Sequence, residues 1–233
     1  MCVIASMAMV SAKTIFEEAF DGSQYIDDQS LMSGSTQTTF GQWSLNNKGQ
    51  GSISISPALS LSASRSLALT IAESGDQAQA IAVFGTEGAK EPTSEAIIAK
   101  VAFYLSDAKG ASTFFIIRGS GENSLGLAKV EAGTAWASFG DEGSFTSLGP
   151  IMPGVWYYLS FSMPANPKYG ESSYKVVLYD TDGSTELKTA SGKLYHHNQE
   201  VSSGDYSYLT VMSTNAYEQI STYFDDFSVQ TNP

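Results

Sequence analysis

Carboxylates stand near both ends of the chain, so a cation site is the first chemistry to consider. Glu18 and Asp21 lie in the opening segment, and Asp225 and Asp226 are adjacent in TYFDDFSVQ near the other end. If the first and last strands pair, these carboxylates converge and repel one another, and a hard cation with oxygen ligands would relieve the repulsion. The sequence therefore predicts a structural Ca²⁺ held by these four residues. In the alternative, Asp225 accepts backbone amides or pairs with a lysine, and the other acids are solvated.

The closing segment 222–230 is predicted to be a strand, in which neighbouring side chains point to opposite faces. Strict alternation places Asp225 on the apolar face with Phe227 and Val229, and Asp226 on the other face. A β-bulge between the two aspartates would exchange their faces.

Several aromatic and polar residues are candidates for binding a sugar. Sugar rings stack their apolar C–H faces on Trp and Tyr, and their hydroxyls need polar partners. The candidate ligand-binding residues are Arg118, Trp136, Trp156, Tyr158, His196 and Asn215. Packing or turn formation is the competing interpretation for each of them, whereas Trp43 is assigned to the core. The hypothesis requires that Arg118, Trp136 and Trp156 line one surface.

Sequence signatures of catalysis are missing. There is no Gly-x-Ser-x-Gly elbow and no phosphate-binding loop. His196 and His197 point in opposite directions on an extended segment, which argues against a shared zinc ion. DTDGS at 180–184 lacks the downstream glutamate of a calcium loop and is better interpreted as a hairpin turn. We therefore predict no catalytic residue.

Composition narrows the possible partners. The 233 residues include 24 Asp plus Glu against 12 Lys plus Arg, a net charge of −12. Such a chain repels phosphate backbones and anionic lipid surfaces, so we expect neither nucleic-acid binding nor membrane insertion.

Residues 1–12 are uncharged, mostly apolar and end in Val10-Ser11-Ala12, which is typical of a signal peptide with its cleavage site. The usual basic segment is missing, so we expect a truncated or misplaced start; a buried first strand is the alternative. The predicted location is secreted: extracellular, periplasmic or at the cell surface. Cleavage would remove Cys2, the one cysteine of the chain, so no disulfide could stabilise the mature protein.

Short segments rich in β-branched and aromatic residues alternate with turn residues, and helical periodicity is nearly absent. The predicted strands are 14–20, 51–56, 66–72, 80–85, 96–106, 112–119, 125–130, 134–139, 155–163, 173–180, 184–191, 206–213 and 221–230. A weak helix candidate lies around 92–98. In VWYYLSFSM, the alternate residues from Val155 to Met163 form an apolar stripe, so one face should meet a core. We expect a single two-sheet domain over 13–230, followed by a tail at 231–233.

Three parts of the sequence carry a family resemblance: FEEAFDG with the following Trp43, the pair GVWYYLSFSM and SYKVVLYDTDG, and the closing STYFDDFSVQ. Together they resemble the concanavalin A-like, laminin G-like jelly-roll domains of secreted bacterial proteins. The resemblance implies an all-β, antiparallel two-sheet jelly-roll β-sandwich. Certain xylanase-associated carbohydrate-binding modules are also similar, and they pair an opening Phe-Glu strand with a closing Asp-Asp strand around a structural calcium. The Glu-x-Asp-x-x-Glu strand of the jelly-roll glucanases, which also resemble this fold, is absent.

These observations favour a secreted, non-catalytic module that binds a carbohydrate or a cell-surface glycan. One alternative is a structural or adhesive surface protein without a small ligand. Another is a glycan-degrading enzyme with an atypical site.

Overall fold

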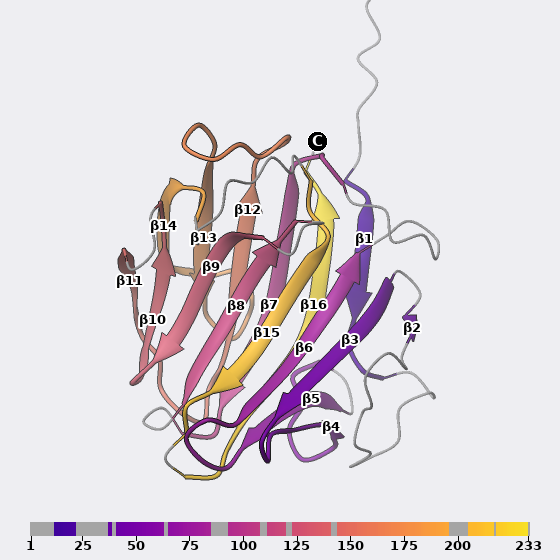
Figure 1. Ribbon diagram of the computed structural model, residues 1–233, viewed down its shortest axis with the longest axis vertical. Helices are drawn as coiled ribbons and strands as arrows, with labels where there is room; N and C mark the ends of the chain where they lie inside the picture. The colour runs from indigo at the N-terminus through magenta and orange to yellow at the C-terminus, as the bar shows by residue number, and fades with distance from the viewer. Residues whose placement is uncertain are drawn as a thin grey trace, which may run out of the picture.

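The computed structural model describes residues 12–21, 37–38, 41–62, 65–84, 93–107, 111–119, 123–140, 144–195, 205–216 and 218–232. Within these ranges the chain forms sixteen strands and two antiparallel sheets that pack face to face (Figure 1). The protein is therefore an all-β jelly-roll sandwich, as predicted.

The two sheets are named A and B. Sheet A runs in the order β14 (Glu186–Lys193), β13 (Ser173–Tyr179), β12 (Trp156–Met163), β7 (Ile97–Leu105), β16 (Ile220–Thr231), β5 (Ser66–Ile71) and β4 (Ser52–Ser56), with β1 (Thr14–Glu18) also paired to β16. Sheet B runs in the order β11 (Phe145–Pro150), β10 (Thr134–Ser138), β9 (Ser124–Glu131), β8 (Ser112–Arg118), β15 (Tyr208–Thr214), β6 (Gln77–Phe84), β3 (Gly41–Lys48) and β2 (Gln37–Thr38).

Every predicted strand is present, and β2, β3 and β11 are additional. The polar residues of β3, and the glycine and proline of β11, interrupt the apolar alternation from which the strands were predicted. Neither strand was predicted for this reason. The helix candidate around 92–98 is wrong, because Thr93 forms a β-bridge with Tyr206 and β7 begins at Ile97. The β-branched residues Ile97, Ile98 and Val101 at the start of β7 fit a pleated sheet better than a helix.

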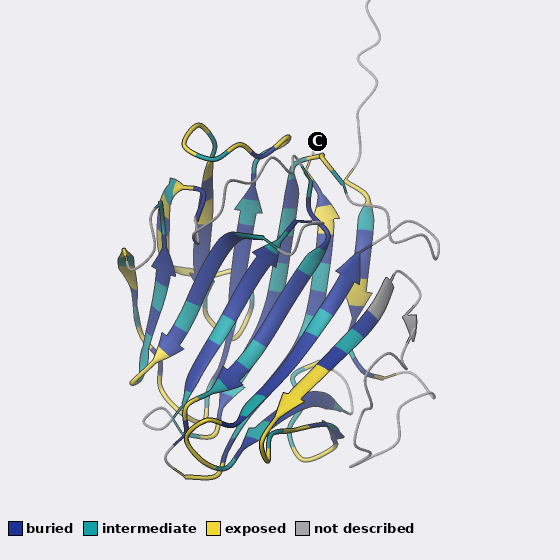
Figure 2. Cartoon of the chain, viewed as in Figure 1, coloured by how far each residue is buried: buried dark blue, intermediate teal, exposed yellow. Residues whose placement is uncertain are grey.

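Aromatic residues join the two sheets in the core. Phe115 of β8 lies with its ring centroid 5.1 Å from that of Phe103 on β7 and 5.9 Å from that of Phe224 on β16. The predicted apolar stripe of β12 is confirmed, since Tyr157, Leu159 and the following alternate residues belong to this core. Figure 2 shows the buried residues alternating along the central strands and the exposed ones gathered at turns and sheet edges.

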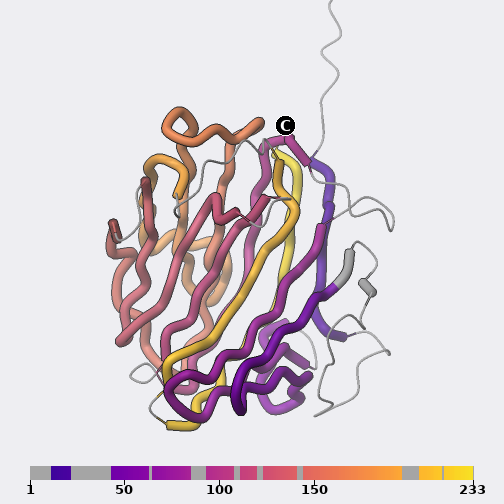
Figure 3. Tube along the Cα trace, in the orientation of Figure 1, coloured from indigo at the N-terminus to yellow at the C-terminus, as the bar shows by residue number. Residues whose placement is uncertain are grey.

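The two ends of the described chain meet in sheet A. Strand β1 pairs with the second half of β16, with Phe16 opposite Val229, and Figure 3 shows the indigo and yellow segments side by side. Next to them Trp43, 1% exposed, packs edge-on against Phe16 and Phe227 with centroids 5.4 and 5.0 Å apart. The core position predicted for Trp43 is therefore confirmed.

One tyrosine bonds the two sheets together through polar groups. Tyr174 of β13 points across the sandwich, where its hydroxyl accepts the Leu127 amide at 3.1 Å and donates to the Ser138 carbonyl. Burial raises the pKa of this phenol, which therefore stays protonated at neutral pH.

Residues 1–11, which carry most of the predicted signal peptide, lie outside the described residues. The described part of the chain contains no helix long and apolar enough to cross a membrane.

Candidate functional site

A β-bulge in β16 turns both adjacent aspartates to the outer face of sheet A. Against β7, Asp225 lies opposite Ala102 while Ser228 lies opposite Lys100, so β16 holds an extra residue at this point. Asp226 has a φ of 46°, in the left-handed region that Asp tolerates better than most residues.

The bulge lets Phe224 and Phe227 both enter the core, at 0% and 1% exposure, although strict alternation would separate them. The expectation that Asp225 shares the face of Phe227 is therefore wrong. The bulge predicted as the alternative is present, but it leaves both aspartates on the outer face instead of exchanging their faces.

Asp225 anchors the connection between β4 and β5. Its carboxylate accepts the amides of Leu61 at 2.9 Å, Ser62 at 3.4 Å and Asp226 at 2.9 Å. The side chain is 0% exposed. Burial raises the pKa of Asp225 to about 6. The three amide hydrogen bonds stabilise the charged carboxylate and so oppose this rise. The predicted alternative, in which Asp225 accepts backbone amides, describes this arrangement.

Asp226 joins three segments of the chain on the same face. The Tyr158 hydroxyl of β12 donates to one carboxylate oxygen at 2.7 Å, and the Ser62 hydroxyl bonds the other. Tyr158 and Asp225 both pair with Ala102 of β7, and this small side chain leaves room for the tyrosine to reach across β7. Burial, and then Asp226, raise the pKa of Tyr158, so its phenol remains a hydrogen-bond donor.

Lys100 of β7 lies beside this pair. Its ammonium nitrogen lies 4.5 Å from the ring centroid of Tyr158 and 5.1 Å from that of Tyr179, and it donates to the Gly183 carbonyl at 2.5 Å. Burial lowers the pKa of Lys100, while the nearby carboxylates of Asp226 and Asp182 oppose this shift.

The turn between β13 and β14 closes over one side of the site. Asp182 accepts the amides of Ser184 and Thr185, both at 2.8 Å, which confirms the predicted hairpin turn. Gly183 has a φ of 64°, and a Cβ there would come within 2.9 Å of the Tyr158 ring and 3.0 Å of the Lys100 nitrogen. Glycine therefore suits this position both for its backbone conformation and for the close approach of the site residues.

Three aromatic rings continue the same face one pleat further along the strands. Tyr104 of β7 lies between Trp156 of β12, at a centroid distance of 5.5 Å, and Tyr223 of β16, at 5.9 Å. Trp156 is 9% exposed, and the two tyrosines are half-buried. Adjacent strands thus present a row of rings, of which Tyr104 and Tyr223 are the more exposed, next to a row of hydrogen-bonding groups.

The name sheet A site is used here for these residues together. It comprises Lys100, Tyr104, Trp156, Tyr158, Tyr179, Tyr223 and Asp226.

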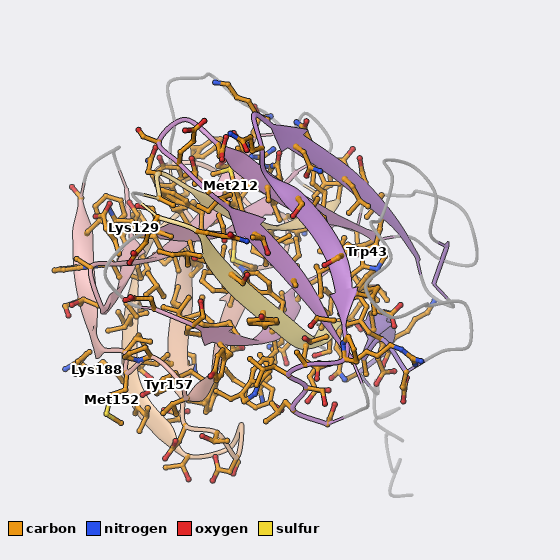
Figure 4. The ribbon with its side chains drawn as sticks, turned by 90° about the horizontal axis from the view of Figure 1, so that it is seen from below. Trp43, Lys129, Met152, Tyr157, Lys188 and Met212 are labelled. Carbon is orange, nitrogen blue, oxygen red and sulfur yellow. The ribbon has the colours of Figure 1, made fainter. Side chains whose placement is uncertain are left out.

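The sequence-predicted binding residues divide between the two sheets. Trp156 and Tyr158 belong to the sheet A site, whereas Arg118 of β8 and Trp136 of β10 alternate with core residues of sheet B and point away from the core. In Figure 4, Lys129, the strand partner of Trp136, lies in one layer, and Tyr157, which stands between Trp156 and Tyr158 in β12, lies in the other. The requirement that Arg118, Trp136 and Trp156 line one surface is not met.

Two further predicted binding residues lie elsewhere. Asn215 is exposed in the connection between β15 and β16, with a φ of 60°. His196 lies outside the described residues.

The predicted calcium ligands do not all face the same side of the sheet. Glu18 pairs with Phe227 on the core side of β1 and accepts the Phe20 amide at 2.8 Å, and Asp21 is exposed beyond the strand. Among the described residues no group of three or more acidic, histidine or cysteine side chains is arranged to hold a metal. A calcium ion bound by Glu18, Asp21, Asp225 and Asp226 stays a prediction.

Sequence reasoning missed four residues of the sheet A site: Lys100, Tyr104, Tyr179 and Tyr223. Each stands at an outward position of a correctly predicted strand, so their alternation with core residues was a usable signal. The order of β12, β7 and β16 in the sheet was the missing information, because it brings together residues more than a hundred positions apart.

Comparison with solved structures supports the fold. No protein-family model and no curated protein matches the sequence. A structure described as a sialidase superposes with a TM-score of 0.60 at 8% identity over 82% of this chain, which corresponds to only 17% of that protein. The endo-β-1,4-glucuronan lyase of the fungus Trichoderma reesei gives a TM-score of 0.56 at 10% identity and covers 88% of this chain and 94% of the lyase.

The Crh5 transglycosylase in complex with NAG gives a TM-score of 0.55 at 10% identity, with 95% of this chain and 89% of that protein covered. At such low identities the similarity establishes a jelly-roll sandwich and leaves function to the residues of the site.

Proposed function

We propose that this protein recognises a glycan, without catalysing its cleavage, through the sheet A site. The observation that carries the proposal is the row of rings formed by Tyr104, Trp156 and Tyr223 beside the Tyr158–Asp226 hydrogen bond. Sugar rings stack on aromatic faces, and their hydroxyls exchange hydrogen bonds with carboxylates and phenols. The sheet A site supplies both kinds of contact on one rigid surface.

The hydrogen bonding and the protonation of the polar groups favour binding without catalysis. Asp225 is enclosed by backbone amides and Asp226 is bonded by Tyr158 and Ser62. The raised pKa of Tyr158 keeps its proton in place at neutral pH and makes it a poor general base. These groups are therefore better suited to hold a sugar than to exchange protons with it.

The similarity in fold to a lyase and a transglycosylase that act on carbohydrates agrees with this proposal. The proposal has two further parts. The domain is of the concanavalin A-like class, and the protein is exported to the cell surface or beyond. Purified exported protein is then expected to begin at Lys13.

A structural calcium that steadies the seam between the chain ends is a further part of the proposal. If Asp225 or Asp226 binds this ion, chelator lowers the melting temperature of the wild-type protein. An unchanged melting temperature in chelator would remove calcium from the proposal.

Binding to a glycan array and retardation in polysaccharide gels test the function, with matched tyrosine variants. Tyr223→Ala removes a ring of the sheet A site, and Tyr208→Ala removes a similarly half-buried outward tyrosine from sheet B. Loss of one stacking ring should weaken binding about tenfold in Tyr223→Ala and leave Tyr208→Ala like the wild type. Equal losses in both variants, or no retention of the wild type, would contradict the proposal.

Release of reducing or unsaturated sugars distinguishes the enzyme alternative. Prolonged incubation of the wild-type protein with a retained polysaccharide should yield no such product. If product accumulates in proportion to protein, the assignment as a binding module is wrong.

A further inference from the structure

Carboxylates surround the polar groups of the sheet A site. Asp226 accepts the Tyr158 hydroxyl at 2.7 Å, with Asp225 next to it in β16. Asp182 precedes Gly183, whose carbonyl accepts the Lys100 ammonium, and Glu186 lies opposite Tyr179 in the register of β13 and β14. Among the described residues, these four carboxylates face a single ammonium group in the middle of the site.

Cations at the border of the site do not reverse this balance. Lys175 is exposed on β13 opposite Ser162, and Arg65 directly precedes β5. Lys188 of β14 lies opposite the core residue Leu178 and therefore faces the other side of the sheet from Glu186. With Lys175 and Arg65 included, the four carboxylates still outnumber the three cations, which favours a negative potential over the rings.

Lys100 is already committed to protein groups. Its nitrogen donates to the Gly183 carbonyl at 2.5 Å and lies over the rings of Tyr158 and Tyr179. A carboxylate of a ligand could recruit this ammonium only by breaking or sharing these contacts while approaching Asp226. The lysine therefore serves the architecture of the site and does not stand ready as an anion receptor.

From these charges we infer that the sheet A site takes neutral glycans and rejects polymers of uronic acids, an inference that rests on the proposed function of this face. Neutral hydroxyl groups find acceptors in the carboxylate oxygens and partners in the phenols, and charge-assisted bonds of this kind are strong. In the calcium-free protein, a sugar carboxylate would meet the negative field of Asp182, Asp226 and their neighbours. The net charge of −12 adds repulsion toward any extended polyanion.

The inference is tested with hexasaccharide pairs that differ only at C6. The pairs are β-1,4-glucan against β-1,4-glucuronan, β-1,4-mannan against β-1,4-mannuronan, and α-1,4-galactan against α-1,4-galacturonan. Each is titrated by calorimetry into the chelator-treated wild-type chain. In whichever pair binds, the neutral member should bind at least tenfold more tightly, a difference of about 1.4 kcal/mol. Raising the salt from 20 to 500 mM should strengthen the uronate and leave the neutral member unchanged, because salt screens repulsion.

A charge-reversal variant provides the control. Glu186 is exposed and lies at the edge of the site on β14. Glu186→Lys should improve uronate binding at least threefold while the affinity for the neutral partner changes less than twofold.

The outcomes separate this inference from the proposed function. A uronate that binds as tightly as its neutral partner, weakens with salt and loses affinity in Tyr223→Ala overturns the preference for neutral sugars and preserves glycan binding at this face. If no member of any pair binds, and polysaccharide gels also fail to retain the protein, the proposed function and this inference fall together.

Discussion

Replacing Asp225 tests whether the bulge in β16 is held as the structure indicates. The carboxylate makes two hydrogen bonds of 2.9 Å, to the amides of Leu61 and Asp226, and a longer one to Ser62. Bonds to a charged acceptor contribute about 1.5 kcal/mol each at the lower end of their range, so Asp225→Ala forfeits about 3 kcal/mol. Relief from burying the charge offsets part of this loss. A net destabilisation of about 1–2 kcal/mol is expected at pH 7.

The same residue gives the stability a pH dependence with a definite sign. Burial raises the folded-state pKa of Asp225 to about 6 from the ordinary value of 3.8, so the folded protein takes up this proton first as the pH falls. The contribution of Asp225 to stability therefore increases as the pH falls from 7 toward 4. Between pH 7 and pH 5 this contribution should grow by about 1 kcal/mol. Neither Asp225→Ala nor Asp225→Asn has a carboxyl group at this position, so neither variant should show the increase.

Urea unfolding of chelator-treated protein at pH 7 and pH 5 measures both effects. The free energy of unfolding of the wild type should exceed that of Asp225→Asn by about 1 kcal/mol more at pH 5 than at pH 7. Glu17→Ala, an exposed carboxylate on β1, is the control and should change stability by less than about 0.5 kcal/mol at either pH. A gap that stays constant or narrows at pH 5 would refute the reasoning about the buried carboxylate.

Three further predictions concern other parts of the fold. Tyr174→Phe leaves the Leu127 amide without its partner at 3.1 Å and should lower the free energy of unfolding in urea by about 1–3 kcal/mol; an unchanged midpoint would show that the inter-sheet bond is dispensable. Gly51→Ala places a Cβ 2.2 Å from the Gln77 carbonyl oxygen and should cost about 2 kcal/mol or more, which a normal melting temperature would disprove. Asp76 accepts three backbone amides, chiefly that of Gln50, which hold its pKa below 3.8, so its stabilisation is present above that pH and is lost as the pH falls below it. The melting temperature of Asp76→Asn should therefore fall less steeply than that of the wild type between pH 4 and pH 2, and parallel curves would contradict this.

The fold could be predicted from the sequence because local alternation and fold agree over most strands. In β12 the apolar residues Tyr157, Leu159 and Phe161 alternate with outward residues and all lie in the core, although the outward Trp156 and Ser160 are buried as well. The segment GQWSLNNK was missed as strand β3 because its pairing with β6, and not its own apolar content, makes it a strand.

The site was only partly predictable because it depends on strand order and on one bulge. Trp156 and Tyr158 were identified, yet Tyr104 and Tyr223 join them only because β7 lies beside β12 and β16 lies beside β7. Alternation alone assigned Asp225 to the wrong face, since a bulge is a local departure that no periodic pattern reveals.

The central claim is that a glycan binds on the outer face of sheet A, and a structure of the complex tests it most directly. The protein is crystallised with the neutral hexasaccharide that it binds most tightly. The account predicts a sugar ring stacked on Tyr104 or Tyr223, with its hydroxyls bonded to Asp226 or Tyr158. A glycan found instead over Trp136 and Arg118 on sheet B, with the sheet A site untouched, would contradict it.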